Sequence, residues 1–263
     1  MTTADTANGR DPGRIQSVDR AVTILEFLAR NGWSGVTEVG DALDVHKSTA
    51  FRLLNTLEGR GLVEQHAATG QYHLGFGLVH LARAVIVGPD IAGRARAGCE
   101  WLAEHTAETV TLSVLEGDDC VTIDQIISSS AVVSRSWLGQ RTPLHCTSPG
   151  KVLLAHLDPD RRAEILGGSL KRYTDHTITD TDQLKLVLEQ VLADGYATTF
   201  EELEEGRASA AAPVLSADGM VVATIEVSGP SYRLGPAELD EVIPLVTEAA
   251  ERASARFGYS NHD

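Results

Sequence analysis

Residues 37–74, TEVGDALDVHKSTAFRLLNTLEGRGLVEQHAATGQYHL, limit the possible folds of this chain more than any other stretch. They predict two short helices joined by a tight turn at residues 44–46. Thr37 is expected to cap the first helix, because a short hydroxyl can accept a bond from an orphan amide at a helix start. The second helix has apolar residues at the spacing i, i+3, i+4, i+7 of an amphipathic helix, and these are Ala50, Leu53, Leu54 and Leu57.

A β-hairpin is predicted directly after the second helix, with strands at residues 62–66 and 71–74 and a turn between them. Residues 15–30 predict a further helix, expected to pack Val18, Val22, Ile24, Leu25 and Leu28 inward. Two helices joined by a tight turn and followed by a hairpin form a winged helix-turn-helix, whose second helix fits the major groove of DNA.

The outer face of the second helix has the chemistry that DNA contacts require. Short hydroxyls suit phosphates, whereas Arg52 and Asn55 suit base edges or phosphates. An ordinary amphipathic helix with a solvated face is the alternative, but the appended hairpin and the lack of acidic residues between Val45 and Thr56 favour DNA. The residues expected to contact DNA are Thr37, His46, Lys47, Ser48, Thr49, Phe51, Arg52, Asn55 and Gln71.

The charge of the chain is divided unevenly. The 263 residues have a net charge of -15 and are 43% hydrophobic, which is enough for packed cores. Residues 1–84 contain 8 Lys and Arg against 9 Asp and Glu, whereas residues 85–263 contain 14 against 28. An acidic surface is repelled by the phosphate backbone, so DNA is expected at the N-terminal end and another partner at the C-terminal end.

The remaining composition predicts a cytoplasmic protein. No run of about 18 apolar residues predicts a membrane span, and the polar residues 1–14 lack the apolar region of a signal peptide and are expected to be a disordered tail. Cys99, Cys120 and Cys146 lack metal-ligand spacing, so they are expected to be buried, reduced thiols; no metal or cofactor is expected.

Residues 90–258 predict an α+β domain, in which helices alternate with strands such as residues 109–115, 120–126, 132–137, 208–215 and 220–228. A helix over residues 76–89 connects it to the N-terminal part. The expected organisation is a tail (1–14), a winged helix-turn-helix domain (15–75), the connector helix (76–89) and a domain with a largely antiparallel sheet (90–258).

Three stretches, QSVDRAVTILEFLA, KSTAFRLLNTLEGRGLVE and YHLG, resemble the DNA-binding domain of IclR-type transcriptional regulators. The resemblance continues through GQRTPLHCTSPGKVLLAHL, GYATTFEELEEGRASAAAPV and ATIEVSGP. It implies a GAF-like effector-binding and oligomerisation domain at residues 90–258, and a connector helix that takes part in dimer contacts.

The resemblance also implies an effector pocket. Acid-sensing members of the family surround a carboxylate with an Asp, a Cys, two Ser and backbone amides at a Gly-Lys helix. The Asp and Cys positions correspond to Thr199 and Ser209, and the two Ser positions to Glu226 and Ser228. With the residues near the Gly-Lys helix, the expected effector site is Leu144, Ser148, Gly150, Thr199, Ser209, Glu226 and Ser228.

Glu226 departs most from the family pattern. It shares one strand face with Val222, Thr224 and Ser228, and this face is expected either to meet solvent or to line the pocket. In the pocket, Glu226 would repel a carboxylate. We therefore expect a polyhydroxyl compound, a phenol or an amine as the effector, and not a simple keto acid.

No catalytic motif is recognised in the sequence. SPGKV lacks the first glycine and the terminal Ser or Thr of a phosphate-binding loop, and His145 next to Cys146 lacks a third catalytic group. The run EELEE at residues 201–205 is typical of a solvated loop.

The sequence predicts a ligand-responsive repressor of a metabolic operon that binds an inverted-repeat DNA operator as a homodimer or homotetramer. Two alternatives remain. One is a small-molecule-binding protein that docks other proteins through its winged helix, and the other is an enzyme with a dispensable N-terminal domain.

Overall fold

The computed structural model describes residues 15–86, 90–127 and 136–260 of the chain, which divides into two compact units, residues 1–89 and 90–263. Three expectations fall wholly or partly outside the described residues: the tail at residues 1–14, the connector end at residues 87–89 and most of the strand at residues 132–137. Within the described part of the chain, no helix is both long and apolar enough to cross a membrane.

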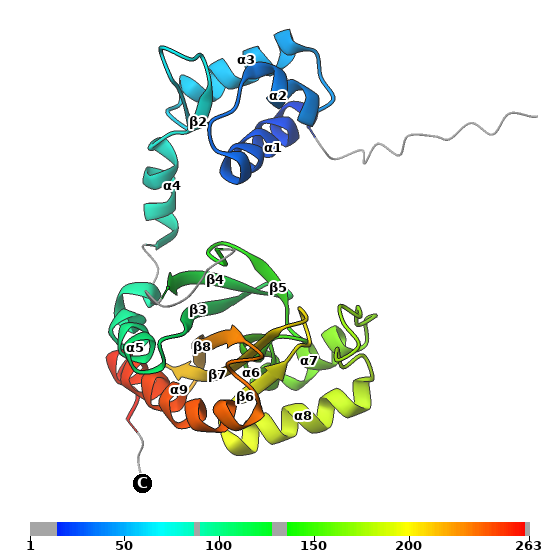
Figure 1. The fold of residues 1–263 in the computed structure, drawn as a ribbon, viewed down its shortest axis with the longest axis vertical. Coiled ribbons are helices and arrows are strands. Elements are labelled where there is room, and N and C mark those ends of the chain that lie inside the picture. Colours follow the sequence, from blue (N-terminus) through cyan, green and yellow to red (C-terminus); the bar gives the residue numbers. More distant parts are fainter. Residues whose placement is uncertain (1–14, 87–89, 128–135, 261–263) are drawn as a thin grey trace, which may run out of the picture. The chain divides into compact units, whose positions relative to one another are not determined.

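The first unit is a winged helix-turn-helix followed by a helix (Figure 1). Its strands β1 and β2 pair antiparallel, with Glu64 opposite His73. One core joins the first three helices to the hairpin through Ile24, Leu28, Val39, Ala50, Leu54, Leu57, Val63 and Tyr72. The elements are α1 (Gln16–Asn31), α2 (Val36–Ala42), α3 (Lys47–Glu58), β1 (Val63–Gln65), β2 (Tyr72–Leu74) and α4 (Gly77–Ile86).

The expected inward face of α1 is partly wrong. Ile24 and Leu28 are 0% and 2% exposed, whereas Val18 and Val22 are 59% and 49% exposed. Leu25 is partly buried and packs against the same core, so the expectation holds for Ile24, Leu25 and Leu28 and fails at Val18 and Val22. Val18 and Val22 therefore leave an apolar stripe on the surface.

The second unit is built around a six-stranded sheet in the order β5–β4–β3–β8–β7–β6, in which all neighbouring strands are antiparallel. The expected α+β class and antiparallel pairing are confirmed, and the short strand β5 is an addition to the expected set. The strands are β3 (Thr109–Glu116), β4 (Asp119–Ile126), β5 (Arg141–Pro143), β6 (Ala197–Phe200), β7 (Arg207–Leu215) and β8 (Val221–Pro230).

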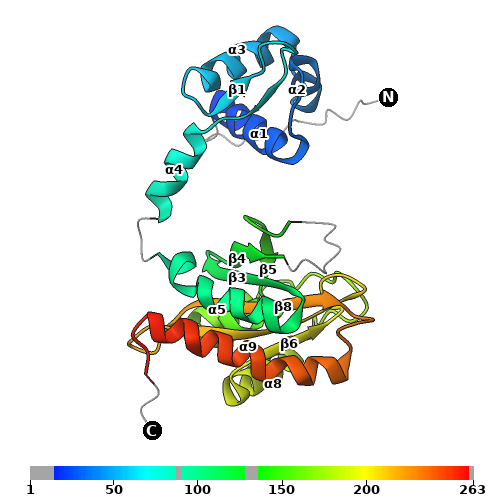
Figure 2. The same cartoon turned by 60° about the vertical axis from the view of Figure 1, so that its left-hand side comes forward.

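Helices cover both faces of this sheet. The helices of the second unit are α5 (Ile91–Thr106), α6 (Ser148–Ala155), α7 (Pro159–Leu166), α8 (Thr181–Asp194) and α9 (Pro236–Arg256). Figures 1 and 2 show α5 and α9 side by side against one face. A Cβ on Gly98 of α5 would lie 2.7 Å from the carbonyl oxygen of Ala249 in α9, so only glycine permits this close contact. On the other face, α6 and α8 share a second apolar core with β6 and β7.

Candidate functional site

Helix α3 presents the residues expected to contact DNA. Its apolar side holds Ala50, Leu54 and Leu57 in the core, and no acidic residue lies in its first turn. A groove of about 310 Å³ between α1 and α3 is lined by Arg20 as well as by Thr49 and Arg52. The expected contacts that α3 exposes fully or partly are Lys47, Ser48, Thr49, Phe51, Arg52 and Asn55.

The starts of α2 and α3 are fixed by local hydrogen bonds. His46 is the N-cap of α3, and its Nδ1 accepts a bond from the backbone N–H of Ser48 at 3.3 Å. The expected capping role of Thr37 is wrong, because α2 starts at Val36 and its N-cap is Gly35, two residues before Thr37. The N–H of Gly35 donates to Glu38 Oε2 at 2.6 Å, and Thr37 lies exposed in the first turn of α2.

Aromatic contacts attach the hairpin to the end of α1. Trp33 stacks on His73 of β2, with ring centroids 4.0 Å apart, and meets His66 edge-on at 5.4 Å. Gln71 lies half-buried just before β2, where its carbonyl oxygen accepts a bond from the N–H of His66 at 2.8 Å. The hairpin is therefore held in a fixed position beside the helices.

In the second unit, strand register gathers polar side chains on the sheet face that α6 covers. Thr111 of β3 lies opposite Glu226 of β8, and Ser209 of β7 lies opposite both Ser228 of β8 and Thr199 of β6. All five side chains belong to residues that are at most 7% exposed. We call these five residues the polar row. Because buried polar groups need hydrogen-bond partners, they must bond to one another, to neighbouring residues or to a ligand.

Glu226 lies at the centre of the polar row. It is 4% exposed, so the alternative in which its strand face meets solvent is wrong. Thr111 Oγ1 donates to Glu226 Oε2 at 2.8 Å, and Ser148 Oγ donates to Glu226 Oε1 at 3.3 Å. These donors hold the carboxylate between a strand and the first turn of α6.

A chain of hydroxyl groups extends from Glu226. The Oγ atoms of Ser148 and Ser209 are 2.7 Å apart, and Thr199 Oγ1 lies 2.9 Å from Ser209 Oγ. The structure thus joins Ser148, Thr199, Ser209 and Glu226 in one network, and the register places Ser228 beside it.

Leu144 and Gly150 were also expected in the effector site, but they lie in an apolar core and in a closely packed helix start. Leu144 is 2% exposed and belongs to the apolar core around α6. The N–H of Gly150 donates to Thr147 Oγ1 at 3.2 Å, and a Cβ on Gly150 would lie 2.5 Å from the carbonyl oxygen of Leu144. Thr147 is the N-cap of α6, so the closely packed helix start already uses this amide.

Sequence reasoning missed Arg207, the first residue of β7. Its Nη2 donates to Glu226 Oε1 at 3.1 Å and to Oε2 at 3.2 Å, and the guanidinium lies 4.4 Å from the centroid of the Trp137 ring. This cation lies beside the carboxylate that was expected to repel an acidic ligand. Arg207 lies two residues before Ser209 and therefore on the same strand face, which was the only signal in the sequence.

A second buried ion pair lies next to α6. Lys151 Nζ is 2.5 Å from Glu202 Oε1, and the two side chains are 2% and 9% exposed. Burial raises the pKa of Glu202, and the positive charge of Lys151 opposes that shift. The expectation that residues 201–205 form a solvated loop is therefore wrong at Glu202, because α6 presents a buried cation to it.

His145 and Cys146 do not form a catalytic pair. His145 Nε2 binds the carbonyl oxygen of Lys171 at 2.9 Å, and burial lowers the pKa of its imidazole. Burial raises the pKa of the Cys146 thiol to about 12, so this sulfur stays protonated near neutral pH. A protonated thiol is a poor nucleophile.

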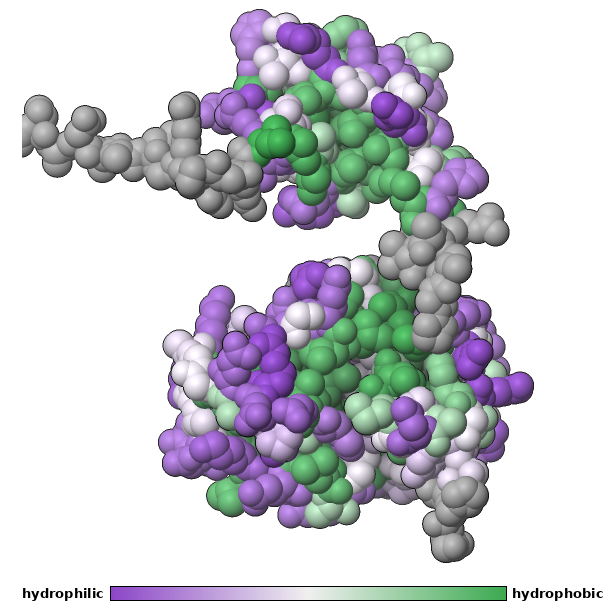
Figure 3. All heavy atoms as spheres, turned by 180° about the vertical axis from the view of Figure 1, so that it is seen from behind, coloured by the Kyte–Doolittle hydropathy of each residue, from purple (hydrophilic) through white to green (hydrophobic). Residues whose placement is uncertain are grey.

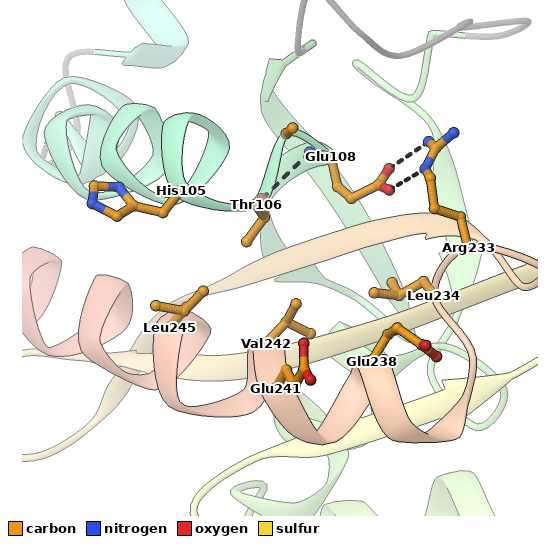
Figure 4. Close-up of a pocket in the computed structure, with 10 residues that line it drawn as sticks. His105, Thr106, Glu108, Arg233, Leu234, Glu238, Glu241, Val242 and Leu245 are labelled. Carbon is orange, nitrogen blue, oxygen red and sulfur yellow. Dashed lines mark hydrogen bonds and ion pairs between the residues drawn. The ribbon is translucent and has the colours of Figure 1, made fainter.

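A groove of about 550 Å³ lies away from the polar row, between the end of α5 and α9 (Figure 4). Glu108 and Arg233 form a bidentate pair at its edge, with N–O distances of 2.5 and 2.9 Å. Leu234, Val242 and Leu245 contribute apolar lining. The groove contains none of the residues predicted for the effector site.

Comparisons with known proteins identify both units. The family of the IclR helix-turn-helix domain matches residues 17–67, and that of the bacterial transcriptional regulator IclR C-terminal domain matches residues 83–255. The chain is 35% identical to the HTH-type transcriptional regulator KdgR of Escherichia coli, covering 96% of this chain and 97% of that protein. It is 34% identical to the HTH-type transcriptional repressor AllR of Klebsiella pneumoniae, covering 92% and 90%.

Solved structures show the same arrangement of elements. Thermotoga maritima IclR superposes with a TM-score of 0.81 at 28% identity, covering 94% of this chain and all of that one. An IclR homologue from Microbacterium hydrocarbonoxydans, solved in complex with 4-hydroxybenzoate, superposes with a TM-score of 0.80 at 25% identity, covering 93% and 100%.

The burial of the cysteines predicts their reactivity. Cys99, Cys120 and Cys146 are unpaired and buried, and burial raises the pKa of each thiol to about 12. At pH 8 we expect negligible reaction of the native protein with a disulfide reagent such as DTNB, and reaction of all three thiols after unfolding in guanidinium chloride. A thiol that reacts within seconds in the native protein would contradict this burial.

Proposed function

The chain belongs to the IclR family of bacterial transcriptional regulators and is a ligand-responsive, DNA-binding regulator, and we propose that α3 reads an operator under the control of the polar row around Glu226. DNA reading by α3 is supported by the exposed residues of its first three turns, which are mainly polar or basic and include no acidic residue before Glu58 at the end of the helix. Residues 15–75 serve as the DNA-binding domain and residues 90–258 as the effector-binding and oligomerisation domain, with residues 76–89 as their connector.

The two ends of α3 are suited to different tasks. Lys47, Ser48 and Thr49 lie in the first turn, where backbone amides and side-chain donors suit phosphate oxygens. Arg52 and Asn55 follow on the exposed face and suit base edges. Arg20 of α1 lines the same groove as Arg52 and adds a positive charge at the side of the helix.

The apolar stripe of α1 supports assembly into a homodimer or homotetramer. Ile15, Val18 and Val22 are 68%, 59% and 49% exposed. Figure 3 shows hydrophobic side chains gathered on one face of the first unit. A contiguous exposed apolar surface indicates an interaction site. A two-fold assembly presents two copies of α3 to an inverted repeat.

Effector binding at the polar row alters operator affinity. A ligand shifts the equilibrium between two arrangements of the protein only by its differential affinity for them. The relative AllR is named a repressor, and we assign the same sign of regulation to this chain, acting on DNA in the cytoplasm. The residues of the polar row bind one another, and the row has no further group that could react with a ligand. We therefore assign ligand binding, and not catalysis, to the polar row.

The proposed assembly predicts the footprint on DNA. We expect protection of an inverted repeat whose half-sites lie about one helical turn apart, or a multiple of that distance. DNase footprinting combined with the mass of the complex measures both the symmetry and the number of chains. A single asymmetric half-site protected by one chain would contradict the assembly.

Two substitutions separate base reading from phosphate binding. Arg52→Ala is expected to cost about 1–3 kcal/mol of operator binding and to relax discrimination at one base pair. Lys47→Ala is expected to weaken operator and random DNA alike and to lower the salt slope by about one. Gel-shift titrations at several salt concentrations measure both, and Arg30→Ala, exposed at the far end of α1, is the matched control. Equal losses on operator and random DNA for Arg52→Ala would assign Arg52 to the backbone.

A further inference from the structure

The space beside Glu226 is occupied by the protein's own cation. The side chains of Arg207 and Glu226 are 17% and 5% exposed, and the guanidinium contacts both carboxylate oxygens. The remaining cavity, lined by Trp137, Thr147, Arg207 and Glu226 among others, has a volume of about 10 Å³. This is room for one water molecule, so an organic ligand enters only if a side chain moves out.

Arg207 is the side chain best placed to move. Glu226 is held by Thr111 and Ser148, which are 1% and 0% exposed and belong to a central strand and a buried helix. Arg207 starts its strand directly after the exposed Glu205 and Gly206, and its side chain already reaches solvent. Its long, flexible stem lets the guanidinium turn outward without disturbing the sheet.

The groups that hold the guanidinium form a binding site for a cation. Glu226 supplies the negative charge, and the Trp137 ring, 4.4 Å from the guanidinium carbon, supplies an aromatic face. Trp137 is itself positioned by its backbone N–H, which donates to Gln125 Oε1 at 3.0 Å. The acidic balance of residues 85–263, with 14 Lys and Arg against 28 Asp and Glu, attracts cations to this unit.

The charge of Glu226 determines which ligand can replace Arg207. A buried carboxylate that loses its cation and gains a neutral group is left largely uncompensated, and this is strongly unfavourable. A ligand ammonium or guanidinium replaces the lost charge, whereas an anion adds repulsion and a neutral hydroxyl restores only a hydrogen bond.

We propose that Arg207 is an internal competitor for the effector, and that the effector is a small amine or guanidino compound that takes its place between Glu226 and Trp137. This inference rests on the proposed function, because it assigns the chemical class of the effector of the same site. The competition also sets the sensitivity of the response, since a ligand that must first displace Arg207 binds more weakly than the site itself allows.

The test removes the Arg207 side chain by substitution and adds methylguanidinium, which has the same charged end group. Methylguanidinium is titrated into Arg207→Ala by calorimetry, with N-methylurea as a neutral probe of similar shape. We expect saturable binding at least about tenfold tighter than to the wild type, loss of that binding in Arg207→Ala with Glu226→Gln, and no binding of N-methylurea. Absence of saturable binding to folded Arg207→Ala would overturn the inference.

A matched control is available on the surface of the same unit. Arg252 pairs with Glu248 at 2.6 Å and lies 4.4 Å from the Trp101 ring, so a carboxylate and a tryptophan ring contact it as they contact Arg207, but its side chain is 52% exposed. Exposed ion pairs contribute little, so Arg252→Ala is expected to bind methylguanidinium no better than the wild type. Equal gains in both variants would show that no buried site is involved and would overturn the inference.

Two further measurements cover the remaining outcomes. If Arg207→Ala fails to fold, thermal unfolding of the wild type is measured with propylammonium, propanol or propionate. Stabilisation by propylammonium alone, lost in Glu226→Gln, supports the inference. Any other order of stabilisation by the three compounds overturns it. Gel shift of the wild type on its operator is run in parallel. Failure to bind DNA would overturn the proposed function separately, whereas bound cations that leave operator affinity unchanged would overturn the effector assignment alone.

Discussion

The architecture of the second unit depends on keeping one carboxylate buried. Burying the Glu226 carboxylate is unfavourable unless a positive charge and hydrogen-bond donors replace the water that it loses. Three separate elements supply these partners: β3 through Thr111, α6 through Ser148 and β7 through Arg207. The antiparallel register contributes to this meeting, because Thr111 lies directly opposite Glu226 and Arg207 begins the adjacent strand β7 on the same face. A change at Glu226 therefore affects β3, β7 and α6 together.

The same interior bears on the effector site that the family resemblance implies. Thr199 and Ser209, which the resemblance places at the positions of an Asp and a Cys, are bonded to each other. The negative charge is found at Glu226, where the resemblance implies a Ser, and Arg207 pairs with it. The proposed effector site thus has a hydroxyl lining, and its charges are arranged differently from the pattern that the resemblance implies.

Local signals predicted most elements, and contacts between distant residues account for what they missed. The spacing of Ala50, Leu54 and Leu57 in α3 and the alternation in β3 and β8 are properties of short segments, so the sequence alone predicted them. The Arg207–Glu226 pair joins residues 19 positions apart, and the Lys151–Glu202 pair joins residues 51 apart. Neither has a local pattern. Val22 and Ile24 are both apolar positions of α1 in the sequence, and only packing against α3 and the hairpin distinguishes them.

Operator binding by the first unit and the state of the polar row in the second unit are proposed to be linked, and linkage is reciprocal. Hydrogen–deuterium exchange of the full chain, with and without operator duplex, tests this without knowledge of the effector. Operator is expected to change exchange at amides of α3 and also at amides of α6, β7 and β8. Changes confined to residues 15–86 would contradict the linkage and leave the polar row without a regulatory role.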